Sequence, residues 1–331
     1  MVLASRQGSR QLISLQSQIT NEAPTLFMTP IPDRSSATLP LIVGLWVVIA
    51  SGVARGGTWV ESFEGKFSRN YFVEPQELVG GWSNQRINPG KGYFGPAGEV
   101  SLVKDPVRSG AGAMKCVRSE KGRRMEFELV NREEKDSPRV GEDCWAAVSI
   151  MAPAESVSHS GMVVQWHGGF PGKAEGKEYA QGPEACLRLD NGQFIYRTNY
   201  KASKEAEPGN RVGTLVEKVV PGQWYDFVFH HSFSLKDEGL TEIWVQGKKV
   251  YSQQGCNAFY YRGKFAFKFG SYGSGTGGTL YFDDAKVVTG AGTYEQVSPG
   301  GVKPLPQATP ETVPASAKSN APATTEPGGE K

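Results

Sequence analysis

The chain has 331 residues, which is enough for one large β domain or two smaller domains with a substantial hydrophobic core. Its formal net charge is only +2, which gives no bulk electrostatic attraction to nucleic acid, so we expect no nucleic-acid partner. Glycine is abundant at 41 residues and helical periodicity is scarce, which favours many strands joined by turns over a helical fold.

Near the N-terminus, an apolar stretch at residues 39–54 reads LPLIVGLWVVIASGVA. Its 16 residues include two glycines and a serine, which is short for a membrane-spanning helix. The small residues Gly52 and Ala54 are placed like a signal-peptidase site, and a start at Met28 would put Arg34 ahead of the apolar part. Residues 1–54 are therefore predicted to be a leader, either a cleaved signal peptide or an uncleaved N-terminal anchor. We expect a secreted protein, periplasmic or extracellular, with no stable membrane span once the leader is cleaved.

Residues 57–289 are predicted to form one all-β domain, because short alternating segments follow one another along it. Two tight hairpins support this prediction, one at Asp190-Asn191-Gly192 and one at Gln246-Gly247. More than ten strands without helices indicate a two-sheet sandwich or jelly roll of the concanavalin A-like class. The expected strands are residues 112–119, 124–130, 144–151, 161–167, 185–189, 194–199, 224–233, 241–245, 248–251, 265–272 and 279–288.

Two of these strands carry reactive side chains on one face. In residues 264–272 every second residue is a phenylalanine up to Phe269, which predicts a buried face and leaves Lys268 and Tyr272 on the opposite, accessible face. Four residues span about 13 Å along a regular strand, so cooperation between Lys268 and Tyr272 requires either a bulge at Gly270 or a bend in the path of the substrate. In residues 161–167, Gln165 and His167 share one side of the strand in the same way.

The four cysteines are too far apart for a compact zinc motif. Either one or two disulfides form in an exported protein, or all four are buried free thiols. From Gly290 to the C-terminus the chain is rich in Pro, Ala, Thr, Ser and Glu and has almost no large apolar residues. Residues 290–331 are therefore predicted to be a disordered tail.

Six segments occur in an order that resembles the secreted polysaccharide lyases of the heparin lyase I and glucuronan lyase type, which have a β-jelly-roll fold. The segments are RME at 124–126, QWHG at 165–168, PEACLRLDNG at 183–192, GQWYDFVFH at 222–230, EIWVQGK at 242–248 and KFGSY at 268–272. The resemblance covers about residues 60–288 and implies β-elimination on a uronic-acid-containing polysaccharide. It leaves calcium open as a cofactor, although no dense carboxylate cluster resembles a calcium loop.

By this resemblance, His167 is the base that takes the C5 proton of the uronate, and Tyr272 is the acid that protonates the leaving O4. Gln165 is expected to hydrogen-bond the uronate carboxylate, and Lys268 to contact a carboxylate or sulfate. Arg124 can clamp an acidic sugar in a bidentate manner.

Three further residues are substrate-binding candidates: Glu126, which could hold Arg124, together with Arg197 and His230. Each of the proposed site residues has a structural alternative. Arg124 and Glu126, for example, could belong to an ordinary charge-paired strand face.

Two other functions fit the same sequence. A non-catalytic carbohydrate-binding module of the laminin-G or lectin class would keep aromatic residues and arginines in the groove without needing the His167 and Tyr272 pair. A sandwich glycoside hydrolase needs two carboxylates about 5–10 Å apart, for which Glu126 and Glu128 are the candidates by strand alternation. The expected partner is an acidic polysaccharide, bound by a monomeric protein.

Overall fold

The computed structural model describes residues 56–69, 71–77, 85–87, 92–169, 182–273 and 277–305. All of them belong to the unit from Gly52 to Lys331. The predicted leader at residues 1–54 and the chain beyond residue 305 lie outside the described residues. Among those described, no helix has the length and apolar character that crossing a membrane requires.

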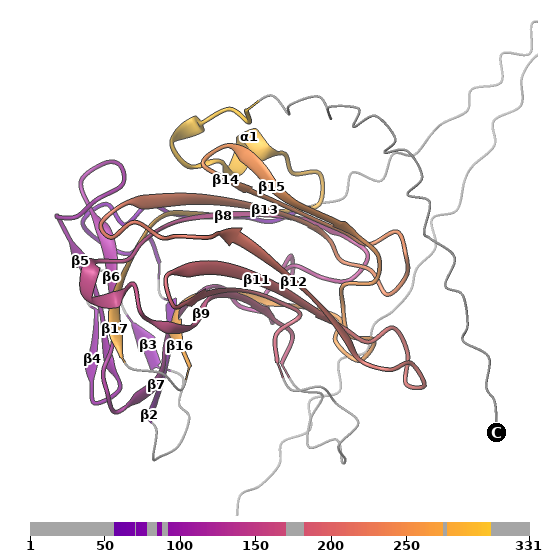
Figure 1. Cartoon of the computed structure of the whole chain (residues 1–331), viewed down its shortest axis with the longest axis horizontal. Coiled ribbons are helices and arrows are strands. Elements are labelled where there is room, and N and C mark those ends of the chain that lie inside the picture. The colour runs from indigo at the N-terminus through magenta and orange to yellow at the C-terminus, as the bar shows by residue number, and fades with distance from the viewer. Residues whose placement is uncertain are drawn as a thin grey trace, which may run out of the picture. The chain divides into compact units, whose positions relative to one another are not determined.

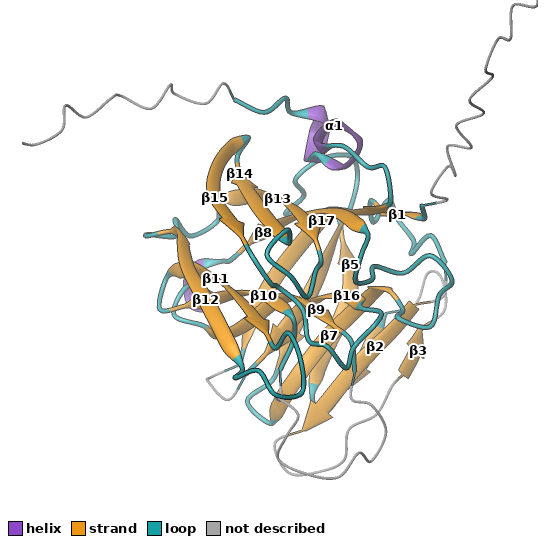
Figure 2. Cartoon of the chain, turned by 90° about the vertical axis from the view of Figure 1, so that its right-hand side faces the viewer, coloured by secondary structure: helices purple, strands orange, loops and turns teal. Residues whose placement is uncertain are grey.

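The described strands form two antiparallel sheets that lie one over the other (Figures 1 and 2). Sheet A contains, in spatial order, β15 (Lys248–Gln254), β14 (Leu240–Val245), β13 (Trp224–Ser232), β8 (Asp143–Met151), β17 (Gly278–Thr289), β6 (Ala113–Arg118), β5 (Gly98–Val103) and β4 (Tyr93–Gly95), with β1 (Thr58–Glu61) also paired to β17. Sheet B contains β12 (Gly209–Val216), β11 (Gln193–Tyr200), β10 (Ala185–Asp190), β9 (Ser160–His167), β16 (Ala266–Tyr272), β7 (Gly122–Val130), β2 (Tyr71–Glu77) and β3 (Gln85–Ile87). The predicted all-β jelly-roll sandwich is confirmed.

The inner faces of the two sheets meet in one aromatic core. Phe265, Phe267 and Phe269 are fully buried, as the alternation in their segment predicted. The ring of Phe269 lies 5.2 Å from that of Phe282 in β17, so it joins the two sheets. Trp166 makes the same connection to Phe229 in β13, with ring centroids 5.0 Å apart. Because the inner residues of sheet B are apolar, its alternate residues must point away from the core.

Both predicted hairpins are present. Asn191 and Gly192 have φ values of 50° and 77°, and Gln246 and Gly247 have values of 51° and 78°. Two successive positive φ values are typical of the type I′ turn, whose twist matches that of the paired strands. The hairpins join β10 to β11 and β14 to β15.

Six described strands were not expected from the sequence, namely β1 to β5 and β12. Most of them are short, and β2 contains Pro75, which argues against a strand when the sequence alone is read. β12 is an edge strand with exposed residues along it, so no apolar alternation marks it. Their pairing is decided by neighbouring strands that are distant in sequence.

The disordered tail was predicted to begin at residue 290, but ordered structure continues beyond that point. A short helix, α1 (Tyr294–Val297), packs against the outer face of sheet A, and Tyr294 and Val297 are buried there (Figure 1). The Tyr294 ring lies 5.3 Å from Trp244. A further turn, η2 (Pro299–Gly301), follows, and the Leu305 N–H donates to the Gly247 carbonyl. Two apolar side chains in a polar segment are enough to fix its first part, because the sheet offers them a partner.

The four cysteines are free and buried, which matches the second of the two alternatives left open by the sequence. A third short helical turn, η1 (Ala154–Ser156), connects β8 to β9.

Phe127 is the centre of an aromatic cluster and offers a test of the core. Its ring lies within 4.5–6.0 Å of those of Tyr71, Phe67, Phe269 and Phe63. We expect Phe127→Ala to lower the free energy of unfolding by about 3–5 kcal/mol, because it leaves a cavity in a packed interior. Phe94→Ala is the control, since Phe94 is 70% exposed and its loss should change stability by about 0.5 kcal/mol or less. Urea denaturation measures both, and equal effects would contradict the packing described here.

Candidate functional site

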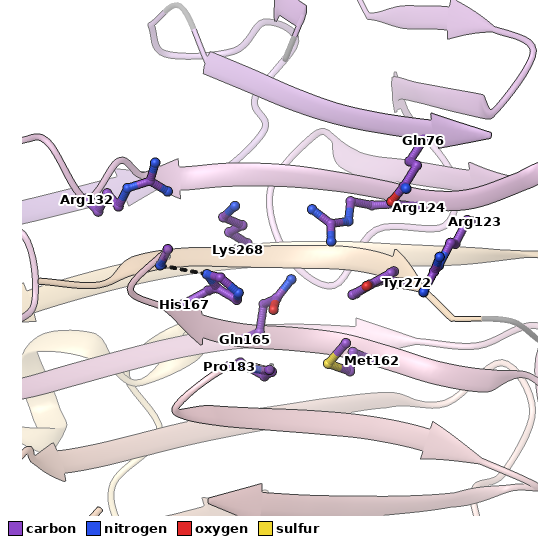
Figure 3. A pocket seen from close by; sticks show the side chains of 12 residues that line it. Gln76, Arg123, Arg124, Arg132, Met162, Gln165, His167, Pro183, Lys268 and Tyr272 are labelled. Atoms are coloured by element: carbon purple, nitrogen blue, oxygen red, sulfur yellow. Dashed lines mark hydrogen bonds between the residues drawn. The ribbon is translucent and has the colours of Figure 1, made fainter. Parts of the chain in front are cut away.

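A groove of about 620 Å³ lies on the outer face of sheet B, the face turned away from the core (Figure 3). Neighbouring strands β2, β7, β16 and β9 supply most of its walls, and the segments after β7, after β9 and before β10 close one end. The described residues that line it are Gln76, Arg123, Arg124, Arg132, Met162, Gln165, His167, Gly169, Gly182, Pro183, Lys268 and Tyr272. Four of these carry a positive charge and none carries a carboxylate.

Strand register brings the predicted site residues together. Lys268 of β16 is paired directly with Gln165 of β9, and Tyr272 is paired with both Arg124 of β7 and Met162. Directly opposed residues in antiparallel strands point to the same side of a sheet, so these side chains share the groove face. Gln165, His167, Lys268, Tyr272 and Arg124 therefore line one groove, although they come from three separate strands.

The bulge expected at Gly270 is present. The register between β16 and β9 shifts between Phe269 and Tyr272, and Gly270 has a φ of 147°. A Cβ atom at this position would lie 2.3 Å from the Met125 carbonyl oxygen of β7. Only glycine fits this backbone, so the irregularity that sets the position of Tyr272 depends on it.

A layer of buried carboxylates lies directly beneath the groove. Glu74 of β2 and Glu126 and Glu128 of β7 are all nearly inaccessible to solvent. Glu74 binds the Lys268 ammonium at 2.5 Å and the Arg124 guanidinium at 2.9 Å. Glu128 lies 3.3 Å from the same ammonium group. These ion pairs hold the two cations in fixed positions at the floor of the groove.

Two sequence expectations are corrected by this layer. Lys268 does not lie on an accessible face, because it is only 3% exposed and is bound by two carboxylates. Glu126 is fully buried and cannot touch a polymer in the groove. It instead accepts a hydrogen bond of 2.5 Å from the Gln165 amide and lies 3.3 Å from the Arg124 guanidinium. The supporting role foreseen for Glu126 toward Arg124 fits this contact.

His167 is held in one tautomer by the backbone that follows it. The Gly169 N–H donates to Nδ1 at 2.8 Å, a contact drawn as a dashed line in Figure 3. A ring nitrogen that accepts a hydrogen bond carries no proton, so the neutral ring carries its proton on Nε2. Burial, together with the nearby cations Arg262, Lys268, Arg124 and Arg132, lowers the pKa of His167 to about 2. In this arrangement the ring presents a hydrogen-bond donor, and action as a base would need the opposite tautomer.

A buried ion pair anchors the backbone that follows His167. The Arg262 guanidinium lies 3.0 Å from Glu184, with both side chains almost completely buried. Glu184 also accepts the Gly168 N–H at 2.9 Å, and Arg262 donates to the Gly182 carbonyl at 2.5 Å. Burial raises the pKa of Glu184 to about 7, although Arg262 opposes that shift. The pair fixes the backbone that places Gly169 against His167.

Tyr272 lies at the other end of the row, between two arginines. The Arg124 guanidinium carbon is 4.1 Å from the centre of the phenol ring, and that of Arg123 is 6.0 Å away. These cation–π contacts place the phenol ring next to positive charge.

Two predicted substrate contacts lie outside the groove. His230 belongs to β13 in sheet A, where it is stacked on Trp145 at 4.0 Å and binds Glu242 at 3.2 Å. The alternation in residues 224–233 predicts a strand but does not show which sheet that strand joins. The assignment of His230 as a substrate contact is therefore wrong. Arg197 of β11 is exposed. Cys186 of β10 is paired with Arg197 on one side and with Gln165 on the other, so Arg197 and Gln165 point to the same face of sheet B. Arg197 nevertheless does not line the groove.

Comparison with known proteins gives the family. A family model described as polysaccharide lyase matches residues 78–286, which is more than half of the chain. The chain belongs to this polysaccharide lyase family. No curated protein matches it.

The solved structure of a glucuronan lyase has a similar fold. The endo-β-1,4-glucuronan lyase from the fungus Trichoderma reesei superimposes with a TM-score of 0.53 at 19% identity, covering 69% of this chain and 98% of that one. The alginate lyase AlyC3 matches with a TM-score of 0.45 at 14% identity, covering 66% of this chain and 89% of that one. At these identities the glucuronan lyase supports the fold alone.

Several residues that line the groove of the lyase, or support the segments around it, were not expected from its sequence. Arg123 adjoins Arg124 and could have been noticed as part of a basic pair, but alternation would place the two on opposite faces. Arg132 follows β7 in a segment without periodicity, and Glu184 and Arg262 are 78 residues apart. Calcium remains an untested cofactor. Within the described ranges, no group of three or more His, Cys, Asp or Glu side chains is arranged to hold a metal ion.

The tautomer of His167 can be measured directly. We expect ¹⁵N NMR of the histidine-labelled lyase to show His167 neutral, with Nε2 protonated and Nδ1 unprotonated, at every pH above about 4, because burial and four cations disfavour the charged ring. His167→Gln removes the signal and so assigns it. A ring that titrates near its ordinary pKa of ~6.5, or that carries its proton on Nδ1, contradicts the arrangement described here.

Proposed function

We propose that this polysaccharide lyase acts on an acidic, uronic-acid-containing polysaccharide and cleaves it by β-elimination. The observation that carries the proposal is the composition of the groove. Four cations, two amides, an imidazole and a phenol line it, and the nearby carboxylates lie beneath it in ion pairs or hydrogen bonds. Such a groove attracts a polyanion and offers hydrogen-bond donors to its carboxylates.

The chemistry requires these donors. The C5 proton of a uronate is next to the carboxylate, and its removal places negative charge on that group. Donors fixed in position before the reaction lower the free energy of this charge in the transition state. We assign this task to Gln165, to the Nε2–H of His167 and to the ammonium of Lys268, which share one face of the groove. Arg124 is held by Glu74 and Glu126 and adds a second cation.

Proton transfer is assigned to Tyr272. With Nδ1 of His167 occupied by the Gly169 N–H, the imidazole serves better as a donor than as the base expected from the sequence. Tyr272, whose ring lies beside Arg123 and Arg124, takes the C5 proton on its phenol oxygen. The C5–H electron pair forms the C4=C5 double bond as the C4–O4 bond breaks. The phenol then returns its proton to the departing O4, so the enzyme ends in its starting state.

The same contacts weigh against a glycoside hydrolase. Its two carboxylates have to face the scissile bond, one as acid and one as base or nucleophile. Glu126 and Glu128, the candidates for that role, are buried and bound to Gln165, Arg124, Lys268 and Asn131. We also propose export of the protein, on the basis of the apolar stretch at residues 39–54 and its small-residue end.

Activity on a panel of polyuronates tests the function. The wild-type protein should generate ultraviolet absorbance from a C4–C5 double bond on at least one of glucuronan, alginate, heparin-like or ulvan-like chains. Tyr272→Phe should lower kcat about 10²–10⁴-fold, since it removes the proton-transfer group. Tyr281→Phe is the matched control, because Tyr281 lies in β17 of sheet A and should leave activity unchanged. Binding without unsaturated product would instead indicate a glycan-binding module, and reducing ends without the double bond would indicate a hydrolase.

Two substitutions of His167 distinguish a hydrogen-bond donor from a catalytic base. If it is a donor, His167→Gln keeps an N–H near the place of Nε2 and should retain most of kcat, whereas His167→Ala should lose about 10²–10³-fold. If it is the base, both variants lose activity to the same extent. Steady-state kinetics on the best substrate of the panel distinguishes the two outcomes.

A further inference from the structure

The amide of Gln165 is held on one side only. Its Nε2 donates to Glu126, while its Oε1 is buried and has no hydrogen-bond partner among the described residues. A buried amide oxygen without a hydrogen-bond partner is destabilising. In this orientation the NH₂ group is bound to Glu126, and the carbonyl oxygen is the other polar end of an amide that lines the groove. An oxygen cannot bind the carboxylate of an acidic sugar, so the orientation conflicts with the chemistry of the groove.

The charges beneath the groove do not balance. Glu74, Glu126 and Glu128 provide three carboxylates, whereas within the described ranges their direct ion pairs involve only Lys268 and Arg124. Glu74 binds both cations, and Glu128 binds Lys268 and also accepts from the Asn131 amide. Glu126 is left with a single guanidinium nitrogen at 3.3 Å, in a geometry that makes no hydrogen bond to its Oε2. One added proton would neutralise the layer, and Glu126 is the carboxyl group with the weakest cationic partner.

We propose that Glu126 is a protonated carboxylic acid that donates a hydrogen bond to Gln165 Oε1 and thereby turns the Gln165 NH₂ group toward the groove. A half-turn of the amide exchanges its O and N atoms with almost no change of shape. The exchange gives Oε1 a donor and Glu126 a single well-placed hydrogen bond. It also presents two N–H groups where a carboxylate is expected. Glu126 is thus a positioning residue. The proposed function enters this inference only in the choice of ligand, which is the carboxylate of an acidic sugar.

The surroundings of Glu126 favour the proton. Burial raises the pKa of Glu126, the Arg124 and Lys268 cations lower it, and the neighbouring Glu74 raises it. Glu74 is its direct neighbour in the register of β2 and β7, so two carboxylates face each other in a site without solvent. The titratable or charged groups facing Glu126 from the packed strands are Glu74, Arg124, Glu128, Lys268, Tyr272, His167, Cys186 and Cys116.

The arrangement has a consequence for activity at high pH. As the pH rises through the raised pKa of Glu126, the carboxyl group loses its proton and attracts the Gln165 NH₂ group back. The amide then shows its oxygen to the substrate, and an acidic polymer binds less well. Glu126 should therefore contribute an alkaline limb to the pH profile of kcat/KM.

The protonation state is tested first, by a measurement that needs no activity. Carboxyl ¹³C NMR of the glutamate-labelled full chain gives a titration curve, and Glu126→Gln assigns the signal by removing it. We expect the Glu126 carboxyl to ionise well above the ordinary glutamate pKa of ~4.3. A signal that ionises at or below that ordinary value overturns the proposal, whether or not the protein proves to be a lyase.

The second test uses two variants on the substrate found in the polyuronate panel. Glu126→Gln donates an N–H to Gln165 Oε1 at every pH, so it should keep KM within a few-fold and lose the alkaline limb. Glu126→Met has a similar size but no donor, so its KM should rise about tenfold, equivalent to ~1.4 kcal/mol. An alkaline limb unchanged in Glu126→Gln, or equal KM values in the two variants, would show that Glu126 does not orient Gln165. Absence of lyase activity in the wild type would refute the proposed function, and the NMR titration would still decide the state of Glu126.

Discussion

Lys268 and Arg124 are cations fixed beneath a groove, and the buried carboxylate of Glu74 binds both of them. Removing charges from water is costly, and a buried ion pair is a weak source of stability for that reason. Here the ion pairs fix the positions of the two cations. A lysine on the surface would lose conformational freedom each time a ligand bound, whereas Lys268 is already ordered by its two carboxylate partners. For the proposed acidic substrate, the groove therefore offers two cationic groups that need no rearrangement on binding.

The sandwich makes this layer possible by separating two faces of the same strands. One face of β16 carries Phe267 and Phe269 into the aromatic core, and the other carries Lys268 and Tyr272. The rigid core fixes the strand, and the bulge at Gly270 adjusts the spacing of the two polar residues. Register with β7 and β9 then adds Arg124 and Gln165. The active face is thus built from positions on neighbouring strands, which hold side chains more firmly than loops do.

His167 illustrates how the end of a strand adds chemistry to this face. The backbone after β9 turns so that the Gly169 N–H meets the imidazole, and the Glu184 and Arg262 pair holds that turn in place. The result is a ring kept neutral and in one tautomer inside a cationic environment. A neutral donor suits the binding of a carboxylate, since it adds a hydrogen bond without adding a further charge to a crowded site. In the proposed function, His167 and Gln165 are the two neutral hydrogen-bond donors to the substrate carboxylate.

The sequence by itself determined the sandwich class, both hairpins and most central strands, because period-two alternation and turn residues depend on local sterics and burial. It also singled out Gln165, His167, Lys268 and Tyr272, since two strands with apolar inner faces had to carry them outward. Only the tertiary structure decided that Lys268 is buried rather than accessible, that Glu126 lies beneath the groove and that His230 belongs to the other sheet. These properties follow from strand order and from ion pairs between segments as far apart as Glu74 and Lys268, which are separated by 194 residues. Alternation tells which residues share a face of one strand, but it carries no information about which strand lies next to it.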